Sequence, residues 1–403
     1  MEPVLIVGAG IVGLTLGQAL KKENIPFRIY ERDASPHARG QGWAITLHWA
    51  LGYIQQILPE ATLQAIQAVQ VDPQVAQHDD GNFLFIDLAT GAPKFKIPPS
   101  TRWRVNRQKM RGALLRGIEE HVQWNAQVVD IETQGTAPPA LVLAEGTRVS
   151  GRFVIGVEGS RSLVRRVLRP DAYLNSVLPI RFTGVAVDLS PEEIRPLRAM
   201  DPLLFQGCHP STGVFFWFSV LETPQSNGTQ GNPDGERYRA QICMSWPLNS
   251  EADEVAASDA ERLDNMKRRS VGFVPFLRSV VEGIPSETPV LEIKLADWEC
   301  LNWDNCDGRI TLAGDAAHAM TMYRGEAANH GLLDAFYLSQ ALRQVYREGR
   351  GAKEALDEYE EEMRSRTRRA VRLSRQACHD AHTWDRLDED SAILTRRAII
   401  GEA

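Results

Sequence analysis

The 403-residue sequence is poor in cysteine, with five residues in all, and none of them lies in a C-x-x-C pair. An odd number of widely spaced cysteines is unlike the paired framework of a small secreted domain, so we expect reduced intracellular thiols. No grouping of His, Cys, Asp or Glu has metal-ligand spacing, and no G-x-S-x-G nucleophile elbow is present. The sequence therefore predicts no disulfide framework and no metal site.

An excess of positive charge is also lacking, because the formal net charge is -7 and the isoelectric point is near 5.8. Nucleic-acid binding depends largely on basic groups that neutralise phosphates, so we expect no nucleic-acid partner. Six arginines between residues 364 and 375 follow the acidic run Glu360–Glu362. We interpret them as a solvated helix face.

A long uncharged run near the start extends from Val4 to Leu20. It follows Met1-Glu2-Pro3 without a positive n-region and contains four glycines, so a strand, a turn and a helix explain it better than a signal or membrane segment. No other segment is long and apolar enough to span a bilayer. We therefore expect a cytoplasmic protein with no membrane partner.

The first informative pattern is a short apolar run at Val4–Val7, a G-x-G-x-x-G segment, an amphipathic helix and a second strand at Phe27–Tyr30. This order predicts a βαβ unit that binds a dinucleotide. Gly8 makes the tight turn, Gly10 lets a pyrophosphate approach the backbone, and Gly13 allows close helix packing. A glycine-rich turn without a ligand is the alternative.

Acidic and basic residues extend this pattern. Glu31 ends the second strand 23 residues after Gly8, where an acid is expected to bind the ribose hydroxyls of an adenosine, with Arg32 beside it. Between Gly40 and Leu58 the glycine-rich sequence predicts a small strand that leads into a helix and whose backbone lies close to a ligand.

A second helix is expected from Arg107 to His121, with Asn106 as its N-cap. Arg107 then lies in the first turn, which is unfavourable for a cation by the dipole argument. We interpret this arginine as facing a phosphate or polyol, and a surface arginine is the alternative.

The most informative segment runs from Ala313 to Asp334. Asp315 follows the apolar run Ile310–Leu312, then come a glycine-containing loop and a predicted helix. A carboxylate and a helix N-terminus thus meet at one point. The carboxylate suits the hydroxyls of a polyol, and the free N–H groups suit a partial negative charge. A flavin with its ribityl chain offers both partners.

The composition, 43% hydrophobic and 24% charged, is that of a soluble globular protein with two domains or one interleaved unit. Alternating segments at Ile180–Leu189, Gly213–Leu221 and Arg237–Trp246 predict strands of an inserted, mostly antiparallel region. We expect an α/β protein with a Rossmann-like FAD-binding domain, a substrate domain and a C-terminal helical segment. The predicted ranges are 1–75, 101–178 and 290–350 for the first, 76–100 and 179–289 for the second, and 351–403 for the third.

Together with Glu158-Gly159, which follows the expected strand Arg152–Val157, these segments resemble the FAD-dependent aromatic hydroxylases. These are class A flavoprotein monooxygenases of the para-hydroxybenzoate hydroxylase fold, and the texture resembles the fungal natural-product branch. The resemblance covers nearly the whole chain. It implies FAD as cofactor, NAD(P)H as a transient co-substrate, O2 and a small-molecule substrate, in a monomer or homodimer.

The resemblance also implies roles for individual residues. The carboxylate of Asp315 would bind the flavin side chain, and the backbone of Ala328 and Asn329 would meet the pyrimidine end of the ring. Two departures stand out: Glu158 replaces the usual aspartate of a DG motif, and Met322 and Ala327 replace a usual proline and glycine. The implied cofactor-binding residues are Gly8, Gly10, Gly13, Glu31, Arg32, Ala44, Arg107, Glu158, Asp315, Ala328 and Asn329.

The implied reaction is hydroxylation or epoxidation of an aromatic or indole-like natural product through a C4a-hydroperoxyflavin. Baeyer–Villiger oxygen insertion is one alternative, and a flavin-binding protein without oxygen chemistry is another. Arg181 resembles an arginine that holds a phenolate or protonates a leaving oxygen, with a strand-end salt bridge as its rival interpretation. His48 and Tyr323 are further candidates for the pocket, and His318 is expected to be structural. The aromatic run Phe215–Phe218 either walls the pocket or packs the sheet.

Overall fold

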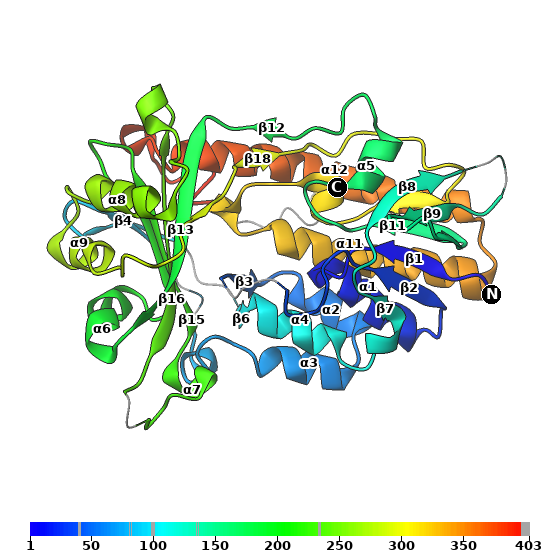
Figure 1. Cartoon of the computed structure of the whole chain (residues 1–403), viewed down its shortest axis with the longest axis horizontal. Coiled ribbons are helices and arrows are strands. Elements are labelled where there is room, and N and C mark those ends of the chain that lie inside the picture. The colour runs from blue at the N-terminus through cyan, green and yellow to red at the C-terminus, as the bar shows by residue number, and fades with distance from the viewer. Residues whose placement is uncertain are drawn as a thin grey trace.

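The computed structural model describes residues 1–38, 42–79, 81, 83–97, 101–133, 135, 137–232 and 235–395. Gly40, where the predicted strand and helix segment begins, lies outside these residues. Two halves lie side by side in Figure 1, a nucleotide-binding-like half on the right and a large sheet covered by helices on the left. Among the described residues, no helix combines the length and the apolar character that a membrane span needs.

The first half is built on a five-stranded parallel sheet in the order β19-β11-β1-β2-β7. Its central strand β1 is buried along its whole length, as expected for a parallel sheet that is covered on both faces. The strands are β1 (Val4–Val7), β2 (Phe27–Tyr30), β7 (Val122–Gln123), β11 (Phe153–Gly156) and β19 (Ile310–Leu312).

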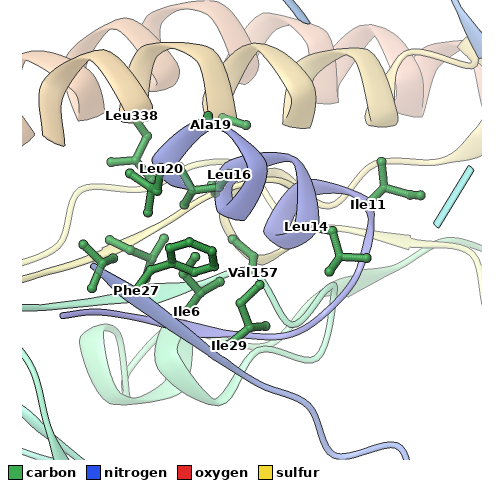
Figure 2. Close-up of a cluster of buried hydrophobic side chains, with 14 of the residues drawn as sticks. Ile6, Ile11, Leu14, Leu16, Ala19, Leu20, Phe27, Ile29, Val157 and Leu338 are labelled. Atoms are coloured by element: carbon green, nitrogen blue, oxygen red, sulfur yellow. The ribbon is translucent and has the colours of Figure 1, made fainter. Parts of the chain in front are cut away.

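Helices cover this sheet, and α1 packs most closely against it. Figure 2 shows Leu16 and Leu20 of α1 gathered with Phe27 of β2 and Leu338 of α11 in one apolar cluster. The helices of this half are α1 (Ile11–Lys22), α2 (Leu51–Ile57), α3 (Glu60–Gln67), α4 (Arg107–Leu115), α5 (Leu163–Leu168), α10 (Asp315–His318), α11 (Ala327–Arg343) and α12 (Ala352–Asp380).

The helix predicted from Arg107 to His121 is shorter than expected. Asn106 is its N-cap as predicted, because its side-chain oxygen accepts hydrogen bonds from the backbone N–H groups of Gln108 and Lys109. The helix α4 ends at Leu115, and Gly117 follows with a φ of +78°. A residue in this left-handed conformation cannot continue a right-handed helix, so the prediction of the C-terminal end was wrong.

The second half is a seven-stranded, mostly antiparallel sheet in the order β17-β13-β16-β15-β14-β4-β5. Only the β14–β4 pair is parallel. The strands are β4 (Phe83–Asp87), β5 (Pro93–Ile97), β13 (Ile180–Leu189), β14 (Leu204–Cys208), β15 (Phe215–Glu222), β16 (Tyr238–Pro247) and β17 (Leu291–Glu292). The predicted fold class, an α/β protein with an inserted antiparallel sheet, is confirmed.

The two faces of this sheet have different neighbours. Helices α6 (Pro191–Met200), α8 (Asp259–Arg269) and α9 (Pro275–Glu282) cover the outer face, on the left in Figure 1. The inner face packs against Tyr323, Cys378 and other residues that follow β19. Any chemistry between the halves therefore takes place on the inner face.

Smaller elements join the two halves. The β3–β6 pair packs against β15, and the short helix α7 follows the C-terminal end of β15. These elements are β3 (Ala44–Leu47), β6 (Trp103–Asn106), α7 (Pro224–Asn227), β12 (Ser176–Val177) and β18 (Ala296–Asp297). A separate three-stranded sheet lies on the far right in Figure 1, within the nucleotide-binding-like half, and consists of β8 (Val128–Glu132), β9 (Ala140–Leu143) and β10 (Arg148–Ser150).

The arginines of α12 are not all on a solvated face, so that interpretation was wrong in part. Arg366 is buried and donates to Asp334, and Arg375 donates to the buried carboxylate of Asp297. These side chains attach the long helix to the rest of the molecule.

Candidate functional site

Three loops meet at one edge of the parallel sheet. β1, β11 and β19 are neighbours and end at the same edge, so the residues that follow them lie close together. Gly8 is so near Glu158 that a Cβ on the glycine would lie 2.9 Å from the Glu158 Cα, and a Cβ on Gly314 would lie 3.0 Å from a methyl group of Val12. The fold thus brings all three predicted cofactor segments to one place.

The glycines of the first loop are needed for different physical reasons. Gly8 has a φ of +113°, and a Cβ on Gly13 would lie 2.1 Å from the carbonyl oxygen of Gly8. Protein contacts therefore require both residues to be glycine. A Cβ on Gly10, in contrast, would meet no protein atom within 4 Å. Glycine at this helix N-cap leaves room for a ligand, which fits the close approach of a pyrophosphate.

The side chain of Glu31 holds the loop after β1 in place through hydrogen bonds. Its two carboxylate oxygens accept hydrogen bonds from the backbone N–H groups of Ala9, at 2.8 Å, and Asp33, at 3.0 Å. Each oxygen has a second lone pair, so the acid retains the capacity to accept from a ribose hydroxyl. Arg32 is exposed beside it. Arg111, which the sequence analysis missed, donates to the Ala9 carbonyl at 2.8 Å.

Glu158 caps the helix that follows it. Its Oε1 accepts from the Ser162 hydroxyl and the Val164 backbone N–H, both at 2.8 Å. Its Oε2 is buried and has no hydrogen-bond partner among the described residues. Burial raises the pKa of this carboxyl, and the hydrogen bonds oppose the shift. The longer acid of this motif therefore keeps a capping role and one buried oxygen without a partner among the described residues.

Asp315 begins α10, directly after Gly314, whose φ is +63°. Its side chain is accessible to solvent although protein atoms surround it closely. Desolvation raises its pKa, and the neighbouring His318 and Arg107 lower it in part. Arg107, predicted to face a polar ligand, thus lies in the electrostatic range of the acid predicted to bind the flavin side chain.

A buried network holds the turn that carries Asp315. The carboxylate of Asp334 accepts from the Gly314 backbone N–H at 2.7 Å and hydrogen-bonds the His318 ring at 2.6 Å. Arg366 donates to its other oxygen at 2.7 Å and also contacts the ring of His330 at 2.8 Å.

The charges in this network decide the ionisation of Asp334. Burial alone raises the pKa of this carboxyl, but the facing His318 and Arg366 lower it well below its ordinary value. His318 serves this network, as the structural role predicted for it requires. The sequence indicated Asp334 only as the end of a helical segment, because its partners lie far away along the chain.

The N-terminus of α11 lies beside β3. No side chain caps this helix, so backbone N–H groups of its first turn, which includes Ala328, are not bonded within the helix. The Asn329 side chain connects the helix to β3, with its oxygen accepting from the His48 backbone N–H at 3.0 Å and its Nδ2 donating to the Thr46 carbonyl at 2.9 Å. Half-buried Ala44 begins that strand.

The loop before α11 differs from the family pattern but is well anchored. Gly325 has a φ of +65°, and Arg324 forms a buried pair with Glu326 at 2.9 Å. Arg324 also donates to the Ala392 carbonyl. Met322 is half-buried in the 3-10 turn Met322–Arg324, and Ala327 is the first residue of the helix. Side-chain contacts therefore fix the loop where proline and glycine are missing.

Tyr323 donates to the Ser245 hydroxyl on β16 at 2.8 Å, and Ser245 bonds Nε2 of His382 at 2.9 Å. Nδ1 of His382 lies 2.7 Å from the Cys378 carbonyl, so it carries the proton and Nε2 accepts from Ser245. Burial lowers the pKa of His382 to about 4. No periodic pattern in the sequence indicated this histidine, which follows the end of α12.

The catalytic role predicted for Arg181 has no support in the geometry. Arg181 pairs with Trp246 on the neighbouring strand, and Trp246 belongs to the outer core, so both side chains point away from the nucleotide-binding-like half. The guanidinium group donates to both carboxylate oxygens of Glu254, at 2.6 and 2.8 Å. The structure shows the alternative that the sequence left open, a salt bridge near the strand end.

The aromatic run of β15 divides between the two faces as its alternation predicts. Phe216 and Phe218 lie in the outer core, whereas Phe215 and Trp217 lie in the inner one. On the inner side Phe215 meets Tyr323 edge to face at 5.1 Å, and Trp217 lies 5.8 Å from the Arg104 guanidinium group. The inner face is therefore both aromatic and adjacent to the loop before α11.

Comparison with known proteins places this geometry in context. The sequence matches the family described as FAD binding domain over residues 1–374. The FAD-dependent monooxygenase dbaB of Emericella nidulans is 44% identical over 342 residues, which cover 84% of this chain and 86% of that protein. A protein of Arthroderma benhamiae named "Probable FAD-dependent monooxygenase" is 39% identical over 413 residues, with 98% and 95% covered.

A solved structure shares the fold. HpxO of Klebsiella pneumoniae, complexed with FAD and uric acid, superposes with a TM-score of 0.73 at 18% identity. The superposition covers 94% of this chain and 89% of that chain.

Two glycine variants separate folding from ligand binding. Gly10→Ala adds a methyl group in open space at the N-terminus of α1, so we expect near-normal stability and a dissociation constant for FAD raised at least about tenfold. Gly13→Ala places a Cβ against the Gly8 carbonyl and should lower the free energy of unfolding by about 1–3 kcal/mol. Urea unfolding without FAD and fluorescence titration with FAD measure the two effects. Normal FAD binding by Gly10→Ala would contradict the placement of the pyrophosphate.

Acid should destabilise the protein through its buried histidines. The pKa of His382 falls from 6.5 to about 4 on folding, and burial also holds that of His330 well below its ordinary value. The unfolded chain then binds protons that the folded chain excludes, so stability is full above pH ~6.5 and falls toward pH ~4 by about 1.4 kcal/mol per pH unit for each histidine. Urea unfolding at saturating FAD measures this slope, which His382→Phe should reduce. An unchanged slope would refute the assignment.

Proposed function

The chain belongs to a family of FAD-dependent monooxygenases, and from this premise we propose that it uses NAD(P)H and O2 to hydroxylate or epoxidise an aromatic or indole-like natural-product intermediate. When bound, FAD supplies the redox chemistry that links the reductant to O2. The sequence contains one G-x-G-x-x-G fingerprint, so we propose that NAD(P)H binds transiently rather than at a second site of this type.

Observations at several of the chain's own residues support the binding of this cofactor. We propose that Gly10 admits the pyrophosphate, that Glu31 accepts from a ribose hydroxyl, and that the exposed Asp315 accepts from the ribityl chain. The free N–H groups at the start of α11, near Ala328 and Asn329, would stabilise negative charge at the pyrimidine end of the ring. Arg107, at the start of α4, and Glu158, after β11, would complete the site.

The aromatic inner face of the sheet is the observation that favours an aromatic substrate. Phe215 and Trp217 lie in the inner core, and this core also contains Tyr323 from the loop before α11. A flat substrate held against these rings would be shielded from water and would lie beside the flavin. Because Arg181 points away from this face, we do not assign it a catalytic role.

The test begins with the purified, FAD-loaded protein. We expect NADPH or NADH to bleach the visible flavin absorbance faster in the presence of a stimulating aromatic or indole compound, with uptake of oxygen. One atom from 18-oxygen gas should enter a phenol or an epoxide. A lactone or ester product would favour Baeyer–Villiger insertion instead. If no aromatic or indole compound stimulates bleaching of the flavin or uptake of oxygen, the monooxygenase proposal is rejected.

Asp315→Ala tests the cofactor site in the same preparation. The variant should lose most of its FAD, because the carboxylate that meets the ribityl hydroxyls is removed. Asp264→Ala, at an exposed position of α8 on the outer side of the sheet, is the matched control and should retain FAD. Equal flavin content in the two variants would overturn the role of Asp315.

A further inference from the structure

One buried side chain on the inner face stands out by its missing hydrogen bonds. Gln206 lies in the middle of β14 and is fully buried, yet neither its Oε1 nor its Nε2 has a partner among the residues that the structure describes. Its strand neighbours Leu204 and Cys208 belong to the inner core and Phe205 to the outer one, so alternation directs Gln206 inward. The amide therefore points toward the half of the molecule that carries the predicted flavin site.

The surroundings of this amide are aromatic. In the register of the sheet, Gln206 lies between Phe85 on β4 and Trp217 on β15. Two other polar side chains on this face have partners: Ser219 accepts from Arg104 at 2.7 Å, and Ser245 belongs to the bonded chain with Tyr323 and His382. Gln206 is thus a polar group enclosed by rings rather than a member of a protein network.

Burying an amide without hydrogen-bond partners lowers the stability of the folded protein. A primary amide has two donor hydrogens and two acceptor lone pairs, and burying them unpaired loses their bonds to water with nothing in return. Native proteins contain few such groups, and each requires an explanation, such as strain, an ordered water or ion, or a functional role. A leucine of similar size would fill the same space without this cost.

We propose that Gln206 recognises a hydroxyl or carbonyl group on the ring of the aromatic substrate. This inference rests on the proposed function and specifies its substrate class, a ring that carries an oxygen substituent. The amide donates to a carbonyl or accepts from a hydroxyl, and the rings of Phe85 and Trp217 contact the flat surface of the substrate. Because solvent does not reach the amide in this structure, the ligand reaches it only when side chains on this face move aside.

A structural water is the rival partner for the amide, and a matched control separates the two. Thr183 on β13 is also buried with an unpartnered hydroxyl, but it shares the outer face with Val185 and Val187. A substrate on the inner face cannot touch it. Gln206→Leu and Thr183→Val each replace an unpaired buried polar group with an apolar one of similar shape, so neither should lower the melting temperature.

The experiment measures the binding of two probes, 2-naphthol and naphthalene, to FAD-loaded protein through the change they cause in flavin absorbance. The wild-type chain should bind 2-naphthol about tenfold more tightly than naphthalene, the effect of one hydrogen bond to a buried polar group. Gln206→Leu should reduce this ratio to about one, mainly by weakening the binding of 2-naphthol. Thr183→Val should keep the wild-type ratio.

Several outcomes overturn the proposal. Equal binding of both probes to the wild-type chain does so, as does the absence of binding by either. An unchanged ratio in Gln206→Leu, or a lower melting temperature in that variant alone, indicates a structural role with a bound water. These results leave the proposed monooxygenase function intact, because stimulated flavin reduction and oxygen uptake test that function independently.

Discussion

The buried carboxylate of Asp334 is the interaction on which the candidate site depends. From α11 it connects the turn at Gly314 and the ring of His318, which lie at the two ends of α10, with the guanidinium group of Arg366 on α12. A charge taken out of water is stable only when its partners compensate for the lost solvation, and removing one partner costs about 3–5 kcal/mol. The network therefore fixes the turn that presents Asp315, and it attaches α12 to the nucleotide-binding-like half.

Elsewhere in the site, hydrogen bonds within the protein also fix the backbone, while other polar groups have no protein partner among the described residues. The side chains that position the loops are hydrogen-bonded to the protein backbone. Arg111 donates to the Ala9 carbonyl, and Asn329 is hydrogen-bonded to the backbone of Thr46 in β3 and of His48. Among the described residues, no protein partner occupies the space at Gly10, one buried oxygen of Glu158 or the first N–H groups of α11. The inner face of the large sheet contributes aromatic rings beside the loop before α11.

Much of this was predictable from the sequence where a local pattern determines the structure. The bounds of β1, β2 and β13 follow from apolar runs and alternation, and the N-cap at Asn106 follows from residue type. The end of α4 was missed although Gly117, a residue type that often takes the left-handed conformation after a helix, was a local signal for it. Which face Arg181 occupies could not be predicted, since alternation assigns side chains to two faces but does not say which face meets the cofactor. Gln206 escaped notice because a single polar residue in an apolar strand shows neither its burial nor its missing partners.

The most direct test of this account is the affinity of Asp334→Asn for FAD. Asparagine keeps the size of the side chain but removes the negative charge opposite Arg366, so the turn before Asp315 should lose its anchor. We predict that the dissociation constant for FAD rises at least about tenfold while circular dichroism shows a folded chain. A folded Asp334→Asn protein that binds FAD as tightly as the wild type would contradict the claim that this network positions the cofactor site.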